Sequence, residues 1–305
     1  MRIPPSLSAL ALAGVLTVGT VGCSSGKNAD GEGGGGTGLE RALGAAPSSV
    51  GSKALTYFDV RTARKLVAKD EKLYRVLNGY GIGELSDYAG NPRENWGFDE
   101  KDVRTAFDVQ GQSSRLTGTF DTEAIAAALK KKGFRAGSAG DGTRFEEPGK
   151  KGSTFEVTES VRVRSDSDRA FALSLAEPEN SLTDDPAYAA VADCLGDVYY
   201  ASFYAKRKKG DVVLLAIGGR LDAGGTSSET ICTVNASKKA ADRTAAKLRT
   251  KTAKGEPYAG STVATGDGDA PVVSMTWKTT SKSGHLPREN DQTSKLPRLL
   301  LLGWG

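Results

Sequence analysis

The chain has 305 residues, of which 38% are hydrophobic and 26% are charged, and its formal net charge at neutral pH is +4. This balance is that of a globular protein with one or two hydrophobic cores, and it excludes a fibrous or multi-pass membrane protein. Basic and acidic residues are interspersed, so the small net charge gives no support to nucleic-acid binding.

The first 22 residues have the layout of a secretory signal peptide. A single basic residue, Arg2, precedes an uncharged apolar stretch that begins at Leu7 and ends at Gly22. This stretch of about 16 residues is shorter than the roughly 20 that a permanent membrane-spanning helix needs. Residues 1–22 are therefore predicted to be a signal peptide that is removed.

The segment that follows the apolar stretch, VGCSS at 21–25, resembles the lipobox of bacterial prolipoproteins of the actinobacterial type. Thr20 stands where that family usually has leucine, and Val21 stands where it usually has alanine or serine. The resemblance is limited to the N-terminal signal and implies that Cys23 becomes the acylated N-terminus. The lipid, such as palmitate, would anchor the protein at the outer face of the cytoplasmic membrane. An ordinary secreted protein and a protein with an uncleaved N-terminal anchor are the alternatives.

Residues 23–53 are rich in glycine and serine and poor in apolar side chains. Such a segment buries too little apolar surface to offset the entropy lost on ordering. It is predicted to be a flexible tether with a root-mean-square reach of about 30 Å. Two or three acyl chains on Cys23 would hold this tether stably in a membrane without a transmembrane helix.

Two cysteines, Cys194 and Cys232, remain after lipidation of Cys23. An even remainder in an exported protein indicates a disulfide. Cys194 lies on the apolar face of a predicted helix at 185–196, and the pair lacks the close spacing of redox or metal-binding cysteines. We therefore predict a structural disulfide that closes about 37 intervening residues.

The body is predicted to repeat the order β-α-β-β-α-β in two parts, 54–152 and 153–280. The first part contains strands at 54–60, 105–111, 115–120 and 143–148, with helices at 61–79 and 121–134; the second contains strands at 169–175, 197–205, 211–221 and 270–279, with helices at 185–196 and 236–250. This order predicts an α+β fold, an antiparallel sheet with helices on one face. Either two tandem ferredoxin-like halves or one larger domain would satisfy it.

No catalytic set stands out in the sequence. The only histidine, His285, lies in a polar tail, which excludes histidine-dependent triads and histidine-cluster zinc sites. We expect no cofactor and no metal. A carboxylate pair needs no histidine, and Asp59, Asp108 and the acidic residues of 99–102 are candidates. A non-catalytic binding or assembly module is thus the leading hypothesis, and a carboxylate-dependent hydrolase acting on cell-wall polymer is the alternative.

The loop 79–100 carries the ligand-contact candidates Tyr80, Tyr88, Trp96 and Phe98 among glycines. Long loops with aromatic side chains are often binding loops. Folding of these rings into a local core is the alternative.

Two more segments could contact partners. The basic turn KRKKG at 206–210 could meet an anionic surface, or it is a solvated turn. The C-terminal tail, 281–305, ends in KLPRLLLLGWG, which is too short to span a bilayer and would dock on its own domain or on a partner. The expected partners are the membrane, through the lipid, and an envelope protein or wall polymer.

Overall fold

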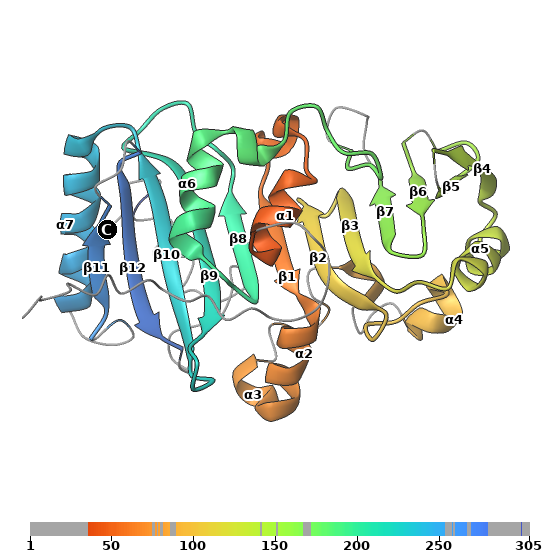
Figure 1. The fold of residues 1–305 in the computed structure, drawn as a ribbon, viewed down its shortest axis with the longest axis horizontal. Coiled ribbons are helices and arrows are strands. Elements are labelled where there is room, and N and C mark those ends of the chain that lie inside the picture. Colours follow the sequence, from red (N-terminus) through yellow and green to blue (C-terminus); the bar gives the residue numbers. More distant parts are fainter. Residues whose placement is uncertain are drawn as a thin grey trace, which may run out of the picture. The chain divides into compact units, whose positions relative to one another are not determined.

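A computed structural model describes residues 36–279, except 75–76, 78, 80–81, 86–89, 141, 151, 167–171, 254–257, 259 and 267–269, together with Leu300. These residues form a 12-stranded sheet in the order β11-β12-β10-β9-β8-β1-β2-β3-β7-β6-β5-β4 (Figure 1). Every pair of neighbouring strands is antiparallel. The predicted α+β class with an antiparallel sheet is confirmed. The signal peptide and Cys23 lie outside the described residues.

The folded body begins earlier than the sequence predicts. Helix α1 (Gly38–Gly44) starts with a capping box in which Thr37 and Glu40 satisfy each other's backbone N–H groups, and η1 (Ser48–Ser52) follows it. Leu39, Leu43 and Val50 are completely or almost completely buried. The prediction of a tether up to residue 53 is therefore wrong for 36–53, because the two leucines, four positions apart, give this short helix an apolar stripe.

The N-terminal half follows with helices and strands that the sequence predicts in part. Asp121 caps α5 by accepting hydrogen bonds from the backbone N–H groups of Glu123 and Ala124, as predicted. The predicted hairpin is formed by β2 and β3. The elements are β1 (Leu55–Asp59), α2 (Val60–Lys69), α3 (Glu71–Tyr74), η3 (Gly83–Leu85), α4 (Pro92–Trp96), β2 (Val103–Val109), β3 (Ser113–Gly118), α5 (Thr122–Lys131), β4 (Arg135–Ala139), β5 (Gly142–Glu146), β6 (Thr154–Val157) and β7 (Val161–Ser165).

The C-terminal half confirms the predicted helix with Cys194 and the hairpin across the basic turn. The predicted strand at 169–175 is wrong over 172–175, which forms no strand; residues 169–171 lie outside the described part of the chain. The elements are η6 (Leu182–Asp184), α6 (Pro186–Leu195), β8 (Tyr200–Tyr204), β9 (Val212–Leu221), β10 (Ser227–Asn235), α7 (Lys238–Ala253), β11 (Thr262–Thr265) and β12 (Val272–Lys278).

The two halves share one topology, which is not the ferredoxin-like one. In each half three strands pair in chain order, a helix then crosses to the far edge of the sheet, and the chain returns inward to the third strand. This is β1-β2-β3, α5 and β4 to β7 in one half, and β8-β9-β10, α7 and β11 to β12 in the other. In a ferredoxin-like unit, the two strands that flank each helix are parallel. Here β1 and β2 flank the helices α2 to α4, but they are antiparallel and pair directly with each other. The N-terminal half has two more strands in its returning meander.

Helices cover both faces of the sheet, which corrects the prediction of one covered face. Side chains alternate along β9: Leu214 packs with α6, and Leu215 packs with α7 on the opposite face. Helix α1 lies on the same face as α6, in front of the sheet in Figure 1. Helices α2 and α5 lie on the same face as α7, because Phe58, which packs with them, points away from the face that carries Tyr57. We call the two sides the α6 face and the α7 face.

The predicted disulfide is present. It joins Cys194 of α6 to Cys232 of β10, with 6.2 Å between the Cα atoms, and Cys232 is completely buried. The bond therefore fixes α6 to the centre of the C-terminal half.

The described residue of the C-terminal tail, Leu300, is buried in the cluster on the α7 face that also contains Tyr258 and Trp277. At this position the tail docks on its own domain. Among the described residues, no helix combines the length and the apolar character needed to cross a membrane.

Candidate functional site

The aromatic candidates of the loop 79–100 pack inward where the structure describes them. Phe98 is completely buried, with its ring edge-to-face on Phe120 at a centroid distance of 5.9 Å. Trp96 is half-buried, and its ring centroid lies 5.8 Å from that of Phe155. The prediction of ligand contact is therefore wrong for Phe98, and both rings form the local core that was the alternative. Tyr80 and Tyr88 lie outside the described residues.

A buried ion cluster, which sequence reasoning missed, attaches the same loop to the sheet. Glu84 and Arg162 are 2% and 0% exposed, and the Nη2 atom of Arg162 lies 2.9 Å from Oε1 of Glu84. Arg164 approaches the other oxygen at 3.2 Å. The Arg162 guanidinium lies between the rings of Phe98 and Phe155, at 4.5 and 4.7 Å from their centroids. Its Nε and Nη1 atoms have no hydrogen-bond partner among the described residues.

The charge state of Glu84 follows from these contacts. Burial alone would raise the pKa of Glu84, but the charges of Arg162 and Arg164 and the hydrogen bond from Arg162 outweigh it, so the net pKa is lowered. Glu84 therefore stays ionised and compensates the buried guanidinium. We interpret the cluster as structural, since Glu84 and Arg162 are both shielded from solvent.

A large open hollow lies on the α6 face of strands β4 to β7. It measures about 1070 Å³, and a second hollow of about 450 Å³ adjoins it along the strands. Both are lined by Arg144, Glu156 and Ser174, so they are parts of one depression, which we call the trough. Its other lining residues are Arg135, Ser138, Gly140, Glu146, Glu147, Pro148, Gly149, Lys150, Gly152, Ser153, Thr154, Thr158, Val161, Ser165, Ala172, Leu173, Leu175 and Ala176.

Strand periodicity explains why the floor of the trough is polar. Arg144 and Glu146 on β5 alternate with Phe145, which is buried on the α7 face. Thr154 and Glu156 on β6 alternate in the same way with the buried Phe155 and Val157. The apolar side chains of β5 and β6 thus pack into the core on the α7 face, and their charged and hydroxyl side chains line the trough on the α6 face.

One wall of the trough is the segment 172–176, which we call the strap. The backbone N–H of Leu173 donates to Ser113 Oγ at 3.0 Å, and that of Leu175 donates to Glu156 Oε2 at 3.1 Å. The Arg115 guanidinium donates to the carbonyl of Ser174. The strap, whose sequence is strand-like, is thus held by side chains of β3 and β6 and not by the backbone of a neighbouring strand.

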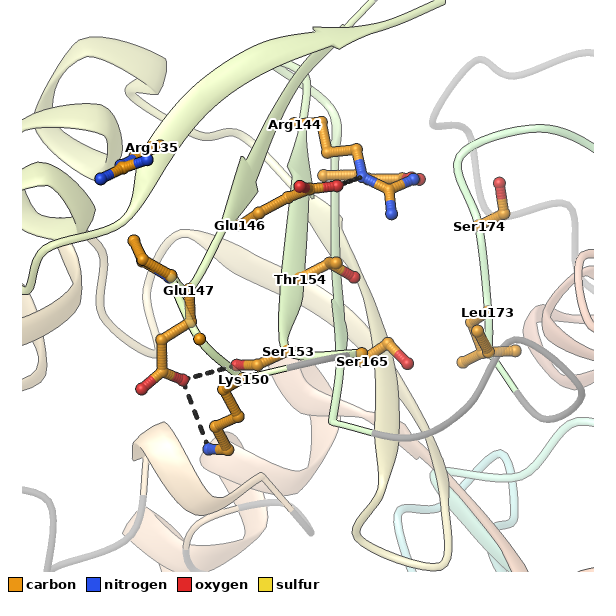
Figure 2. Close-up of a pocket in the computed structure, with 15 residues that line it drawn as sticks. Arg135, Arg144, Glu146, Glu147, Lys150, Ser153, Thr154, Ser165, Leu173 and Ser174 are labelled. Carbon is orange, nitrogen blue, oxygen red and sulfur yellow. Dashed lines mark hydrogen bonds and ion pairs between the residues drawn. The ribbon is translucent and has the colours of Figure 1, made fainter.

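The charged groups of the trough are mostly paired. Nε of Arg144 lies 2.9 Å from Glu146 Oε1, and its Nη1 lies 3.3 Å from Glu156 Oε1. Lys150 lies 3.3 Å from Glu147. Arg135 is exposed and forms no ion pair with any residue that the structure describes. Figure 2 shows Arg135 on one side of the hollow and Ser174 on the other, with Thr154 between them.

The glutamates of the trough are poorly arranged for acid catalysis. Ser153 donates a 2.8 Å hydrogen bond to Glu147, and this bond, with the nearby Lys150, lowers the pKa of Glu147. A general acid needs the opposite shift. Glu146 and Glu156 both bind the one guanidinium of Arg144, so they do not face each other across an open space.

The carboxylates that the sequence offered for a hydrolase have local roles. Asp59 caps α2 by accepting the N–H of Thr62 at 3.1 Å, and Asp108 accepts the N–H of Gly111 in the turn after β2 at 2.7 Å. Asp99 and Asp102 bind Arg93 at 2.9 and 2.7 Å. None of these carboxylates lines the trough.

A hydrolase of this kind needs two carboxylates that flank its substrate, and Trp96, the aromatic candidate for lining such a site, does not line the trough. Trp96 packs on Phe155, whose ring belongs to the α7 face, whereas the trough lies on the α6 face. The part of the chain that the structure describes contains no group of three or more His, Cys, Asp or Glu side chains that could hold a metal ion.

Sequence reasoning missed the trough, although a weak signal was present. The run TFEV at 154–157 has apolar residues at alternate positions, and TRFE at 143–146 has one apolar residue between polar neighbours, which is typical of half-buried strands. Strands β4 to β7 pair in chain order, but the register that brings their polar residues together has no clear signal in the sequence. Comparison of the chain with protein-family models, curated proteins and solved structures finds no match in any of the three.

Proposed function

We propose that the protein is a non-catalytic binding module of the bacterial cell envelope, anchored through lipid on Cys23 at the outer face of the cytoplasmic membrane. The observation that carries the binding role is the trough. Its larger hollow, about 1070 Å³, matches the upper end of the range in which proteins hold small ligands, roughly 300 to 1,000 Å³. The lipobox-like segment 21–25 supports the location.

The Cys194–Cys232 bond also supports an extracytoplasmic location, since structural disulfides persist mainly in oxidising compartments. With Cys23 lipidated, every cysteine of the chain has a role in an exported protein.

The trough is built for recognition rather than for proton transfer. Arg144 is held by two carboxylates, and Glu147 is held by Lys150 and Ser153. Such mutual contacts fix the side chains before a ligand arrives, which lowers the entropic cost of binding. The alternative, a carboxylate-dependent hydrolase, has no comparable support, because no described carboxylate pair lies free across the hollow.

Photo-crosslinking in whole cells tests the binding role. Benzoylphenylalanine at Thr154, in the floor of the trough, is expected to give a discrete adduct after irradiation. The matched control is the same group at Arg249, an exposed residue of α7 outside the trough. A Thr154 adduct that is absent from the Arg249 control supports the proposal. Identical products from both positions, or no product from Thr154, would contradict it.

A further inference from the structure

A strongly basic surface lies on the α7 face, outside the trough. The 16 residues of α7 include six basic side chains and one acidic one, and the turn KRKKG at 206–210, between β8 and β9, adds four more basic ones. Helix α6 packs on the opposite face of the same strands and has one acidic and no basic residue. Positive charge is therefore concentrated on one side of this half of the sheet.

Two contacts hold the basic turn beside α7. Arg243 of α7 binds Asp211, the residue after the turn, with Nε 2.9 Å from Oδ2 and Nη2 2.6 Å from Oδ1. The backbone N–H of Ala236, just before α7, donates to the carbonyl of Asp211 at 2.9 Å. The pKa of Asp211 is lowered by the hydrogen bond from Arg243 and also by the charge of Lys247. The turn and the helix thus form one surface.

The cations of α7 nearest the turn form one stripe. Positions 239, 243 and 247 are four apart, so their side chains lie above one another on the same side of the helix. This stripe and the tip of the turn make up the basic face, which consists of Lys208, Lys209, Lys239, Arg243 and Lys247. Lys247 is half-buried and the others are exposed. Apart from Arg243, none of them forms an ion pair with a residue that the structure describes.

Helix stability does not explain these charges. Lys239 lies in the first turn of α7, where the helix dipole disfavours a cation, and this turn has no acidic residue. Lys130 and Lys131 of α5 lie in the last turn of their helix, where cations complement the dipole. Residues that oppose the local preference of their element are expected at functional surfaces.

We propose that the basic face binds the surface of an anionic phospholipid bilayer. This proposal rests on the lipid anchor of the proposed function, which holds the body next to a bilayer. None of the five residues lines either hollow of the trough, and the exposed side of a helix is convex, which suits a flat surface better than a compact ligand. Each basic side chain near an anionic bilayer strengthens binding about fivefold.

The contact is made by charge and not by insertion of apolar side chains. Among the described residues, Leu221 is the one large hydrophobic side chain that is exposed, and it lies at the end of β9, outside the basic face. Binding should therefore be strongly sensitive to salt, because exposed charges are screened by ions.

The lipid and the basic face can reach the same bilayer. The described body begins at Gly36, before α1 on the α6 face, and Cys23 precedes it by 13 residues. Thirteen residues span at most about 45 Å. A sheet with a layer of helices on each face is about 30 Å thick. The segment after Cys23 is therefore longer than the distance from one face of the body to the other.

Energy transfer from the body to a vesicle surface tests the proposal. The full-length lipidated protein is bound to phosphatidylcholine vesicles that contain an acceptor lipid, with or without about 30% phosphatidylglycerol. The donor is a coumarin amino acid at Ala246, an exposed residue of α7, and the matched control is the same donor at Ala189, an exposed residue of α6. We expect phosphatidylglycerol to raise transfer from Ala246 at least about twofold and transfer from Ala189 not at all. Salt at about 0.5 M should remove the rise.

Two double variants locate the contact. Lys239→Gln with Lys247→Gln is expected to lower the equilibrium constant for contact about 25-fold and to bring transfer from Ala246 to its level on neutral vesicles. Lys130→Gln with Lys131→Gln removes the same charge from α5, where both lysines are exposed, and should leave the rise unchanged.

The outcomes separate this proposal from the lipid anchor. Equal transfer from Ala246 on neutral and anionic vesicles, an equal rise for Ala189, or an equal loss in the two double variants overturns the proposal. Release of the contact by soluble polyphosphate, at the phosphate concentration of the vesicles, also overturns it and assigns the basic face to an anionic polymer. Failure of the lipid anchor has a different readout, since the protein would then not float with neutral vesicles.

Discussion

Glu84→Gln is expected to destabilise the body by about 3–5 kcal/mol, the range found when one partner of a buried ion pair is removed. The amide keeps the shape of the side chain but leaves the charge of Arg162, which is 0% exposed, with no carboxylate in contact. Urea unfolding followed by circular dichroism measures the change. The control is Glu146→Gln, which breaks an exposed ion pair with Arg144 and should cost no more than about 1 kcal/mol.

Two further measurements separate charge from packing. The double variant Glu84→Leu with Arg162→Leu should be more stable than Glu84→Gln, because it removes both buried charges.

The pKa of Glu84 is lowered in the folded state, so the contribution of Glu84 to stability is present above the ordinary value of 4.5 and is lost as pH falls through the lower folded pKa. Stability of the unmodified protein should therefore fall below about pH 4.5 more steeply than that of Glu84→Gln. Equal stability of Glu84→Gln and Glu146→Gln would contradict the role of the cluster.

Removal of the disulfide is expected to have an effect of similar size. Cys194→Ala with Cys232→Ala frees a loop between positions 38 residues apart, which in the chain-entropy account costs roughly 3 to 4 kcal/mol. For a body of this size the melting temperature should fall by about 10 °C. Scanning calorimetry with and without reductant measures it.

The double alanine variant is its own control in that experiment. Reductant should lower the melting temperature of the unmodified protein toward that of the variant and should leave the variant unchanged. A melting temperature that does not respond to reductant in either protein would show that the Cys194–Cys232 bond does not stabilise the fold.

The features that the sequence predicted well have strong local signals. Helix α5 has an N-cap, an apolar repeat and terminal lysines, and its predicted range, 121–134, contains the observed Thr122–Lys131. The disulfide followed from counting cysteines once Cys23 was assigned to lipid. The β8–β9 hairpin followed from two apolar runs around a basic turn.

The features that the sequence did not predict depend on contacts between distant segments. Helix α1 is ordered because Leu39 and Leu43 meet a core formed by α6 and the sheet, which glycine-rich composition cannot reveal. The apolar side chains of β9 alternate between the two faces of the sheet, so each face offers an apolar surface to a helix. A shift of one residue in strand register would move each of these side chains to the opposite face. The trough depends on four short strands that follow one another in the chain and on a strap whose contacts with Ser113 and Arg115 join it to the more distant β3.

The aromatic loop shows why residue type alone misleads about a binding site. Phe98 and Trp96 are aromatic residues of the kind found at contact surfaces. In the structure, however, the guanidinium of the buried Arg162 packs over the ring of Phe98, and Nζ of Lys132 lies 4.2 Å from the centroid of the Trp96 ring. The residues that line the trough are charged and hydroxyl side chains of ordinary strands, and only their pairing indicates a site.

Mass spectrometry of the native protein from its own cells tests the central claim, a lipid-anchored module outside the cytoplasmic membrane, most directly. The account predicts an N-terminal peptide that begins at Cys23 and carries acyl chains, in a protein whose Cys194 and Cys232 peptides are crosslinked. An intact N-terminus that retains residues 1–22, or an unmodified Cys23, would contradict it.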